Sequence, residues 1–293
     1  MTRPAQSLIV HPSGSPSGPV LSITPEQAGW EALHFEVRQL APGARFGSTT
    51  GEHELGLMVL GGRCTVRSSR GEWPEIGERA NVFGGLPYAL YLPRQTEWSV
   101  EALSPCEIAF GWCAVSSDHP ARLITPDDVT IEIRGGDNVT RQINGVIPPG
   151  FPCERLVMVE VYTPGGNWSS FPPHKHDVHR VDADGALVEA DLEEIYFYRF
   201  DRPNGFAYQR VYTDDRSTDE LLLCQDCDLV LVPYGYHPVV AAPGSTAYYL
   251  NILAGSAQSL AASDDPKYAW IKQSYTGTDP RIPIYPVDQA TDH

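Results

Sequence analysis

The chain has 293 residues, of which 42% are hydrophobic, and its formal net charge at neutral pH is −16. This size and apolar content allow one large core or two domains, and we favour two. Such an acidic chain is not expected to bind nucleic acid or an anionic membrane, because both partners require a basic surface. No apolar run is long enough to span a membrane and no signal-peptide pattern is present, so we expect a cytoplasmic protein.

Short runs rich in β-branched and aromatic residues recur along the chain between turns that contain Pro or Gly, which predicts antiparallel β-structure. Helix is scarce: Thr24-x-x-Gln27 is typical of a helix start, and a second short helix is expected within 263–273. The expected strands lie within 55–66, 88–93, 98–103, 106–115, 129–135, 156–164, 193–200, 206–213, 228–233 and 247–255.

A loose internal similarity indicates two barrels in tandem. Residues 82–102 and 227–251 both run from a strand through a Pro-containing turn into another strand. We therefore predict an all-β fold with an N-terminal barrel at 1–122 and a C-terminal barrel at 123–293. In the first half the single candidate ligand, His53, has no companion, so we assign any metal site to the second half.

A His-x-His pair, His174 and His176, follows two prolines. In a strand the two imidazoles share one face, with Cα atoms about 6–7 Å apart, whereas Lys175 points to the other face. Pro172 and Pro173 forbid helix upstream and are tolerated where a strand begins. The spacing therefore favours a metal-binding pair on a strand.

Such a site needs a carboxylate and a third imidazole from neighbouring strands. Glu194 offers the carboxylate if it points inward, in which case Glu193 points away, and His237 follows a Gly turn. His179 competes as the third imidazole but has the wrong strand parity. Six cysteines are present, and Cys224-x-x-Cys227 has no second pair to complete a zinc site, so we interpret all six as reduced structural thiols.

These residues resemble the two motifs of the cupin superfamily, with a longer insert between His176 and Glu194 than is usual. More narrowly, the segments 160–177, 192–200, 232–244 and 248–255 resemble the 5-deoxy-glucuronate isomerases of myo-inositol catabolism, which are relatives of 5-keto-4-deoxyuronate isomerase. The resemblance implies two tandem cupin barrels. It also implies a divalent metal, zinc before manganese or iron, that is held by His174, His176, Glu194 and His237.

The implied reaction is an aldose–ketose isomerisation that turns 5-deoxy-D-glucuronate, a small sugar acid, into 5-dehydro-2-deoxy-D-gluconate. Tyr196, Tyr198, Tyr248 and a metal-bound hydroxide are the candidate bases. A cation must bind the substrate carboxylate, and Trp168 could cover the pocket. Of four candidate arginines, Arg141, Arg180, Arg199 and Arg210, we assign Arg180 and Arg210 to the substrate, whereas parity disfavours Arg199.

Two alternatives stay open at this point. A cupin dioxygenase uses a similar ligand set with iron, and a sugar-binding or storage bicupin needs no catalysis. For the enzyme we expect a homo-oligomer.

Overall fold

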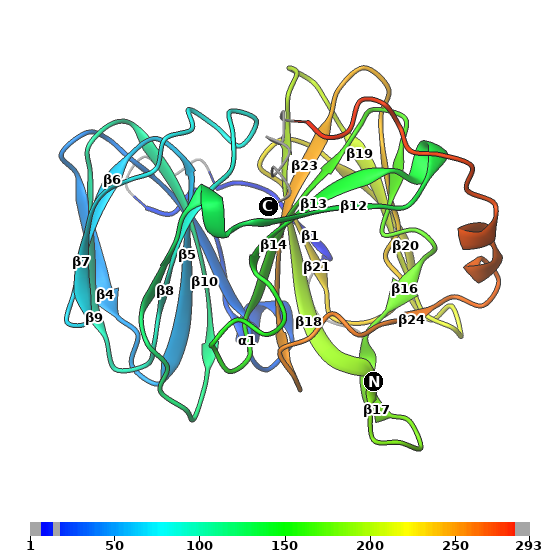
Figure 1. Ribbon diagram of the computed structural model, residues 1–293, viewed down its shortest axis with the longest axis horizontal. Helices are drawn as coiled ribbons and strands as arrows, with labels where there is room; N and C mark the ends of the chain where they lie inside the picture. Colours follow the sequence, from blue (N-terminus) through cyan, green and yellow to red (C-terminus); the bar gives the residue numbers. More distant parts are fainter. Residues whose placement is uncertain (1–6, 14–17, 285–293) are drawn as a thin grey trace, which may run out of the picture.

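The computed structural model describes residues 7–13 and 18–284. The predicted all-β architecture of two tandem barrels is confirmed: two barrels of antiparallel strands lie side by side, and the chain fills the first before most of the second (Figure 1). Each barrel combines one large sheet with one smaller sheet.

The first barrel contains ten strands. Its large sheet has the spatial order β11 (Arg122–Ile124), β8 (Tyr88–Leu92), β5 (His53–Gly61), β10 (Cys106–Ala114), β3 (His34–Leu40) and β2 (Leu21–Ile23). Its smaller sheet has the order β4 (Arg45–Thr49), β9 (Glu97–Ala102), β6 (Cys64–Ser68) and β7 (Gly71–Ile76).

The second barrel has a longer central sheet. This sheet has the order β1 (Ile9–Val10), β21 (Leu229–Val232), β18 (Leu187–Phe200), β23 (Ala247–Gly255), β14 (Val157–Thr163), β13 (Arg141–Ile147) and β12 (Thr130–Arg134), and β17 (Asp177–Val181) also pairs with β18. Opposite it lie β15 (Trp168–Ser169), β22 (Val239–Ala241), β19 (Ala207–Tyr212) and β20 (Asp219–Cys224), beside the small pair β16 (His174–Lys175) and β24 (Ser263–Asp264).

The domain boundary between residues 122 and 123 stays a prediction. Strand β11 spans it and pairs with β8 of the first barrel. Strand β1, at the other end of the predicted N-terminal domain, pairs with β21 of the second barrel, where Ile9 lies opposite Val230.

Both expected helical stretches are present and short. Helix α1 (Pro25–Ala28) begins with Thr24 and Gln27 in a reciprocal capping arrangement. The C-terminal stretch forms the 3-10 helix η3 (Ala269–Gln273), and two further 3-10 turns are η1 (Pro126–Asp128) and η2 (Asp137–Val139). No helix among the described residues is long and apolar enough to cross a membrane.

The two large sheets pack against each other, so their central strands, such as β5, β14 and β23, are buried on both faces. In β18, Ile195 and Phe197 enter the core shared by the two barrels, whereas Tyr196, Tyr198 and Phe200 enter the core of the second barrel. The alternation predicted for this strand is therefore correct, and its outward face contacts protein instead of water. A third core fills the first barrel.

Two carboxylates, the half-buried Glu193 and the buried Glu54, tie the barrels together in a reciprocal way. Glu193 of β18 accepts hydrogen bonds from the backbone N–H groups of residues 31–33, which lead into β3. Glu54 of β5 accepts hydrogen bonds from those of residues 154–156, at 2.7–2.9 Å, just before β14. Each barrel thus holds the loop that starts a strand of the other large sheet, and Glu193 points away from the second barrel's interior, as predicted.

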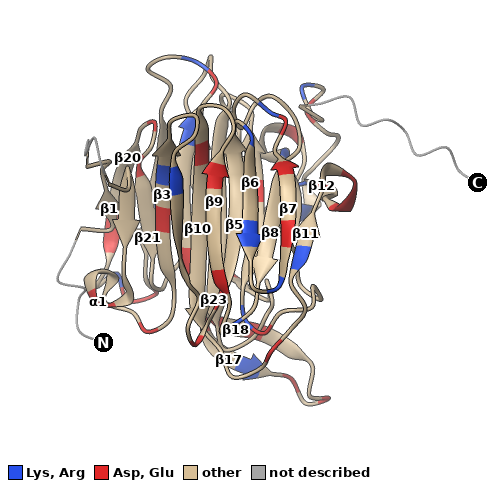
Figure 2. Cartoon of the chain, turned by 90° about the vertical axis from the view of Figure 1, so that its left-hand side faces the viewer, with Lys and Arg blue, Asp and Glu red and all other residues tan. Residues whose placement is uncertain are grey.

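Positions of both charge signs occur along the strands drawn in Figure 2, where Lys and Arg positions lie near Asp and Glu positions. A buried ion pair lies between the barrels, in which Arg79 Nη2 is 2.6 Å from Glu160 Oε1. Tyr248 and Asn144 also donate hydrogen bonds to Glu160.

This buried pair gives a stability prediction. The Glu160→Gln variant leaves the Arg79 charge without its carboxylate in a buried site, which should lower the free energy of unfolding by about 3–5 kcal/mol. Urea denaturation followed by tryptophan fluorescence measures the effect. Arg45→Gln is the control, because the Arg45 side chain is 71% exposed in its pair with Glu101, and its midpoint should match the wild type. Equal midpoints for both variants would contradict the prediction.

Candidate metal centre

Three buried side chains converge at the inner face of the second barrel. The ligand atoms of His176, Glu194 and His237 all lie within 4.8 Å of one another. Glu194 Oε2 is 2.9 Å from His176 Nε2 and 3.3 Å from His237 Nε2. Among the described residues, this is the one group of three or more such side chains with that geometry.

The local backbone orients the side chains of His176, Glu194 and His237 toward one another. His176 lies between β16 and β17, and Glu194 belongs to β18 with the inward parity described above. His237 follows a turn after β21 in which Gly235 has φ +90°, a conformation that favours glycine. The turn is fixed by Asp177, which accepts a hydrogen bond of 2.7 Å from the Gly235 N–H. The residue after His176 therefore positions the loop that carries His237.

The protonation pattern of the two imidazoles matches metal ligation. Nδ1 of His176 lies 2.9 Å from the Leu192 carbonyl, and Nδ1 of His237 lies 2.9 Å from the Gly235 carbonyl. A carbonyl only accepts, so each Nδ1 carries a hydrogen and each Nε2 faces Glu194. Nε2 of His237 is buried without a hydrogen-bond partner among the described residues. The unpartnered Nε2 of His237 and the Nε2 of His176 both face one carboxylate, and a metal ion bound between them would take the place of a proton on His176, so these residues fit a metal ion.

The two imidazoles have opposite pKa shifts in the protein without metal. Burial lowers the pKa of His237 to about 3, so that its ring is neutral. Burial also opposes protonation of His176, but the hydrogen bond and the charge of Glu194 outweigh it and raise the pKa of His176. Two imidazoles and one carboxylate form a donor set suited to zinc, iron or manganese.

His174, the fourth predicted ligand, lies at the edge of this cluster. Its ring centroid is 4.7 Å from that of His237, and burial lowers its pKa to about 3. It is not one of the three residues whose ligand atoms meet, and it is only partly buried. His174 also lines a cavity of about 420 Å³ between β12, the segment around Phe171 and Pro172, and the C-terminal residues 260–275. A cavity of the size that small ligands occupy therefore lies beside His174, whose ring is next to that of His237.

Comparison with known proteins assigns the family. Residues 8–271 match the model of the KduI/IolB family. The chain belongs to this family. Proteins named 5-deoxy-glucuronate isomerase from Geobacillus kaustophilus and Geobacillus thermodenitrificans are 42% and 41% identical to it, over 92% and 89% of this chain and 96% and 94% of theirs.

Solved structures agree with the family and the fold. An IolB-like protein from Salmonella typhimurium LT2 is 37% identical, with a TM-score of 0.86 over 91% of this chain and 99% of its own. Oxalate decarboxylase from Lactobacillus farciminis is 11% identical, with a TM-score of 0.60 over 84% of this chain and 83% of its own, and shows the fold alone. The expected pair of cupin barrels is confirmed.

The three candidate tyrosines of this KduI/IolB family member have different surroundings. The Tyr196 ring centroid is 5.8 Å from that of His237, and its hydroxyl lies 3.0 Å from Ser170 Oγ. The Tyr198 hydroxyl donates to Gln209 Oε1 at 2.8 Å. Tyr248 faces the other way: its hydroxyl donates to Glu160 at 2.9 Å in the core between the barrels.

The position of Tyr248 corrects our assignment within β23. Every residue of this strand except its last is buried, so polarity does not reveal which side chains face inward. Its neighbour Tyr249 enters the second barrel's core, where its ring centroid is 4.9 Å from that of Tyr196. The sequence contained no signal that would have chosen Tyr249 over Tyr248.

The structure does not bring the arginines assigned to the substrate to the cluster. Arg210 is paired with Asp219 by two hydrogen bonds of 2.7 Å on β19, and Arg180 of β17 binds Ser263 and Glu189 with a side chain that is 53% exposed. Neither lines the cavity beside His174. Trp168 is half-buried and packs on Phe171, one of the cavity's lining residues.

Arg199 and Arg141 have opposite environments. Arg199 binds Glu107 of the first barrel at 2.9 Å and Asp226 at 3.2 Å, which agrees with its outward parity. Arg141 is buried and lines the cavity beside His174.

The other candidate ligands, which are His179, the Cys224–Cys227 pair and His53, lie outside the cluster. His179 lies on β17 and contacts Ser256 Oγ at 2.8 Å, outside the cluster. Cys224 and Cys227 are free thiols, and burial raises the pKa of each to about 12, so neither is a thiolate at neutral pH. His53 contacts the carbonyl of Thr50.

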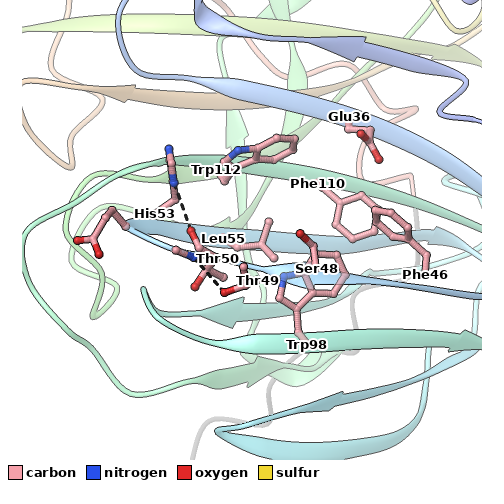
Figure 3. A pocket seen from close by; sticks show the side chains of 12 residues that line it. Glu36, Phe46, Ser48, Thr49, Thr50, His53, Leu55, Trp98, Phe110 and Trp112 are labelled. Atoms are coloured by element: carbon pink, nitrogen blue, oxygen red, sulfur yellow. Dashed lines mark hydrogen bonds between the residues drawn. The ribbon is translucent and has the colours of Figure 1, made fainter.

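The first barrel has a counterpart of this position without the ligands. Glu54 and Glu193 make equivalent contacts in equivalent strands, so the next residues, Leu55 and Glu194, correspond. Leu55 lines a cavity of about 460 Å³ with aromatic walls that include Trp98 and Trp112 (Figure 3). The two carboxylates lining it, Glu36 and Glu52, are each paired with an arginine, Arg38 and Arg94. A leucine thus occupies the position where the second barrel has its carboxylate.

Metal analysis tests the cluster directly. Purified His176→Ala and His237→Ala variants should each fall from about one bound metal ion per chain to less than about 0.1, because each loses a donor that the remaining residues cannot replace. Elemental analysis by mass spectrometry gives the content. His179→Ala is the matched control and should keep the metal, and circular dichroism should show an unchanged fold in all three. Full metal content in either cluster variant would refute the site.

Proposed function

We propose that this protein is an aldose–ketose isomerase that converts 5-deoxy-D-glucuronate into 5-dehydro-2-deoxy-D-gluconate. The observation that carries the proposal is the buried His176, Glu194 and His237 cluster beside a cavity, in a chain 42% identical to a protein named for this activity. The proposed cofactor is a divalent metal, zinc before manganese or iron, held by these three residues with His174 as the fourth candidate ligand.

The chemistry requires a hydrogen to move from C2 to C1 while the carbonyl moves from C1 to C2. A divalent cation at the cluster would polarise the carbonyl and make the C2 hydrogen more acidic. The protein's own groups must then hold and transfer protons near these carbons, and they must exclude bulk water. Burial of the cluster supports the second requirement, since Glu194 is only 5% exposed and His237 is 0% exposed.

Among the tyrosines, we propose that Tyr196 stabilises the oxygen that gains negative charge during the proton transfer. Its ring is next to His237, and burial and the nearby Glu194 charge raise its pKa well above the ordinary value, so the phenol keeps its proton. A protonated phenol donates a hydrogen bond to an oxygen that gains negative charge as the C–H bond breaks. Tyr198 is further along the same face with its hydroxyl bound to Gln209, and we give it a supporting role in packing.

Paired substitutions test the role of Tyr196. Tyr196→Phe should lower kcat by about 100-fold with little change in KM, because the lost interaction forms in the transition state. Tyr198→Phe, which removes a hydroxyl from the same face of β18, should change kcat by less than about 5-fold. Steady-state kinetics with 5-deoxy-D-glucuronate gives both numbers. Equal losses in the two variants would remove the special role of Tyr196.

Isotope exchange tests the route of the hydrogen. Transfer through an enediol exposes the migrating hydrogen to solvent, so turnover in heavy water should place deuterium on the product's new CH2OH carbon. NMR of the product measures the label. Product formed at the normal rate without deuterium would indicate a direct hydride shift or a fully shielded proton instead.

The two alternatives have distinct outcomes in the same preparation. A cupin dioxygenase would consume oxygen with its substrate, and a sugar-binding protein would leave the aldehyde of every uronic acid unchanged. Following aldehyde loss by NMR together with oxygen uptake separates all three functions. Homo-oligomerisation and a cytoplasmic location stay predictions.

A further inference from the structure

We propose that the cavity beside His174 contains a carboxylate-binding subsite whose cation is Arg141, with the hydroxyl of Tyr275 as a second donor. The inference deepens the proposed function, because it names the group that the site would recognise in a sugar acid. It begins from an unusual feature of Arg141, a buried guanidinium that no carboxylate neutralises.

Arg141 differs from the other cations that line this cavity. Arg134 is bound to Glu132 by hydrogen bonds of 2.6 and 2.7 Å, and Lys272 is paired with Asp264. Arg141 is only 6% exposed, and its Nη1 donates only to backbone carbonyls, those of Val139 at 3.2 Å and Phe171 at 3.4 Å. No ion pair to Arg141 exists among the described residues. A buried and uncompensated guanidinium is costly, so it is retained where an anionic ligand completes it.

The hydroxyl of Tyr275 supplies a second unpartnered group. This oxygen is buried and has no hydrogen-bond partner within the described part of the chain, and the side chain lines the same cavity. Burial raises the pKa of Tyr275, so the phenol keeps its hydrogen as a donor. A guanidinium that has backbone carbonyls but no carboxylate as partners, and a phenol without an acceptor, match the two oxygens of a carboxylate.

The backbone makes room for this pair. A Cβ atom on Gly135 would lie 2.8 Å from Arg141 Nη1, and one on Gly136 would lie 2.5 Å from Tyr275 Cβ. The C-terminal segment that carries Tyr275 is attached to the same turn, because Asp137 accepts hydrogen bonds from the N–H and the hydroxyl of Thr276. The Gly-Gly turn therefore holds both donors against one cavity, and His174 lies on its wall.

Arg141 is also better placed to bind the substrate than Arg180 and Arg210, the two arginines that we assigned from the sequence. A small sugar acid must reach the metal cluster and a cation at the same time. Arg141 shares a cavity with His174, next to the cluster, whereas Arg180 and Arg210 are paired on strands outside that cavity. Arg141 is therefore the cation that can bind the carboxylate while the opposite end of the substrate faces the cluster.

A charge-matched pair of ligands tests the subsite without turnover. The probes are the substrate reduced at its aldehyde, as the free acid and as the uncharged amide; neither can be isomerised. Calorimetric titration of the purified protein should show the acid binding at least about 10-fold more tightly than the amide. In Arg141→Met the affinity for the acid should fall about 30- to 100-fold, while that for the amide changes by less than about 3-fold. Arg141→Lys should recover part of the loss.

Thermal unfolding of the ligand-free variants excludes a merely structural role. Loss of an unneutralised buried charge should leave the melting temperature of Arg141→Met equal to or above that of the wild type, whereas a structural arginine would lower it. Arg45→Gln, on the outer surface of the first barrel, controls for loss of any positive charge and should bind both probes normally.

The outcomes separate the subsite from the proposed function. An unchanged acid-to-amide ratio in Arg141→Met, or the loss appearing in Arg180→Gln instead, would overturn the subsite even if the wild type isomerises 5-deoxy-D-glucuronate. Acid-selective binding that depends on Arg141 in a protein without isomerase activity would support the subsite and refute the proposed function.

Discussion

The arrangement of this molecule depends on the burial of both faces of strand β18. Its odd-numbered side chains Ile195 and Phe197 form part of the core between the barrels, and its even-numbered ones line the second barrel. Because the side-chain period of a strand is two, consecutive glutamates separate completely: Glu193 binds backbone N–H groups of the first barrel, and Glu194 meets two imidazoles. A shift of one residue in register would exchange these roles and bury a charge in each wrong place.

Much of the fold and of the geometry of the candidate metal centre could be predicted because both depend on local period and turn chemistry. The strand parity of Glu194 and the glycine before His237 follow from alternation and from a positive φ angle, and both are visible in the sequence. Tyr248 was assigned to the wrong face because nearly every residue of β23 is buried. The apolar pattern therefore does not show which side chains of this strand point into the barrel. From the sequence we assigned Arg180 and Arg210 to the substrate in preference to Arg141, because pairing and burial depend on contacts between distant segments that the sequence does not show.

The two barrels show how one architecture can have different electrostatics. The position of Glu194 is taken by Leu55 in the first barrel, where the cavity walls are aromatic and the acids that line it are matched by arginines. In the second barrel a carboxylate and two imidazoles are buried together, and a buried guanidinium lies nearby. Ionisable groups are expensive to bury, so their concentration in one barrel is itself an argument that chemistry occurs there.

The short strand β1 precedes the first barrel in the sequence but belongs to the second barrel in the structure. Ile9 and Val10 pair with β21, and the Leu8 carbonyl accepts a hydrogen bond of 2.8 Å from the Leu231 N–H. During synthesis on the ribosome, β1 emerges long before its partner strand β21, because the whole first barrel is synthesised between them. The second barrel's edge therefore closes late, with a segment that is synthesised before the first barrel, and the loop closed by that pairing is among the most entropically costly in the protein.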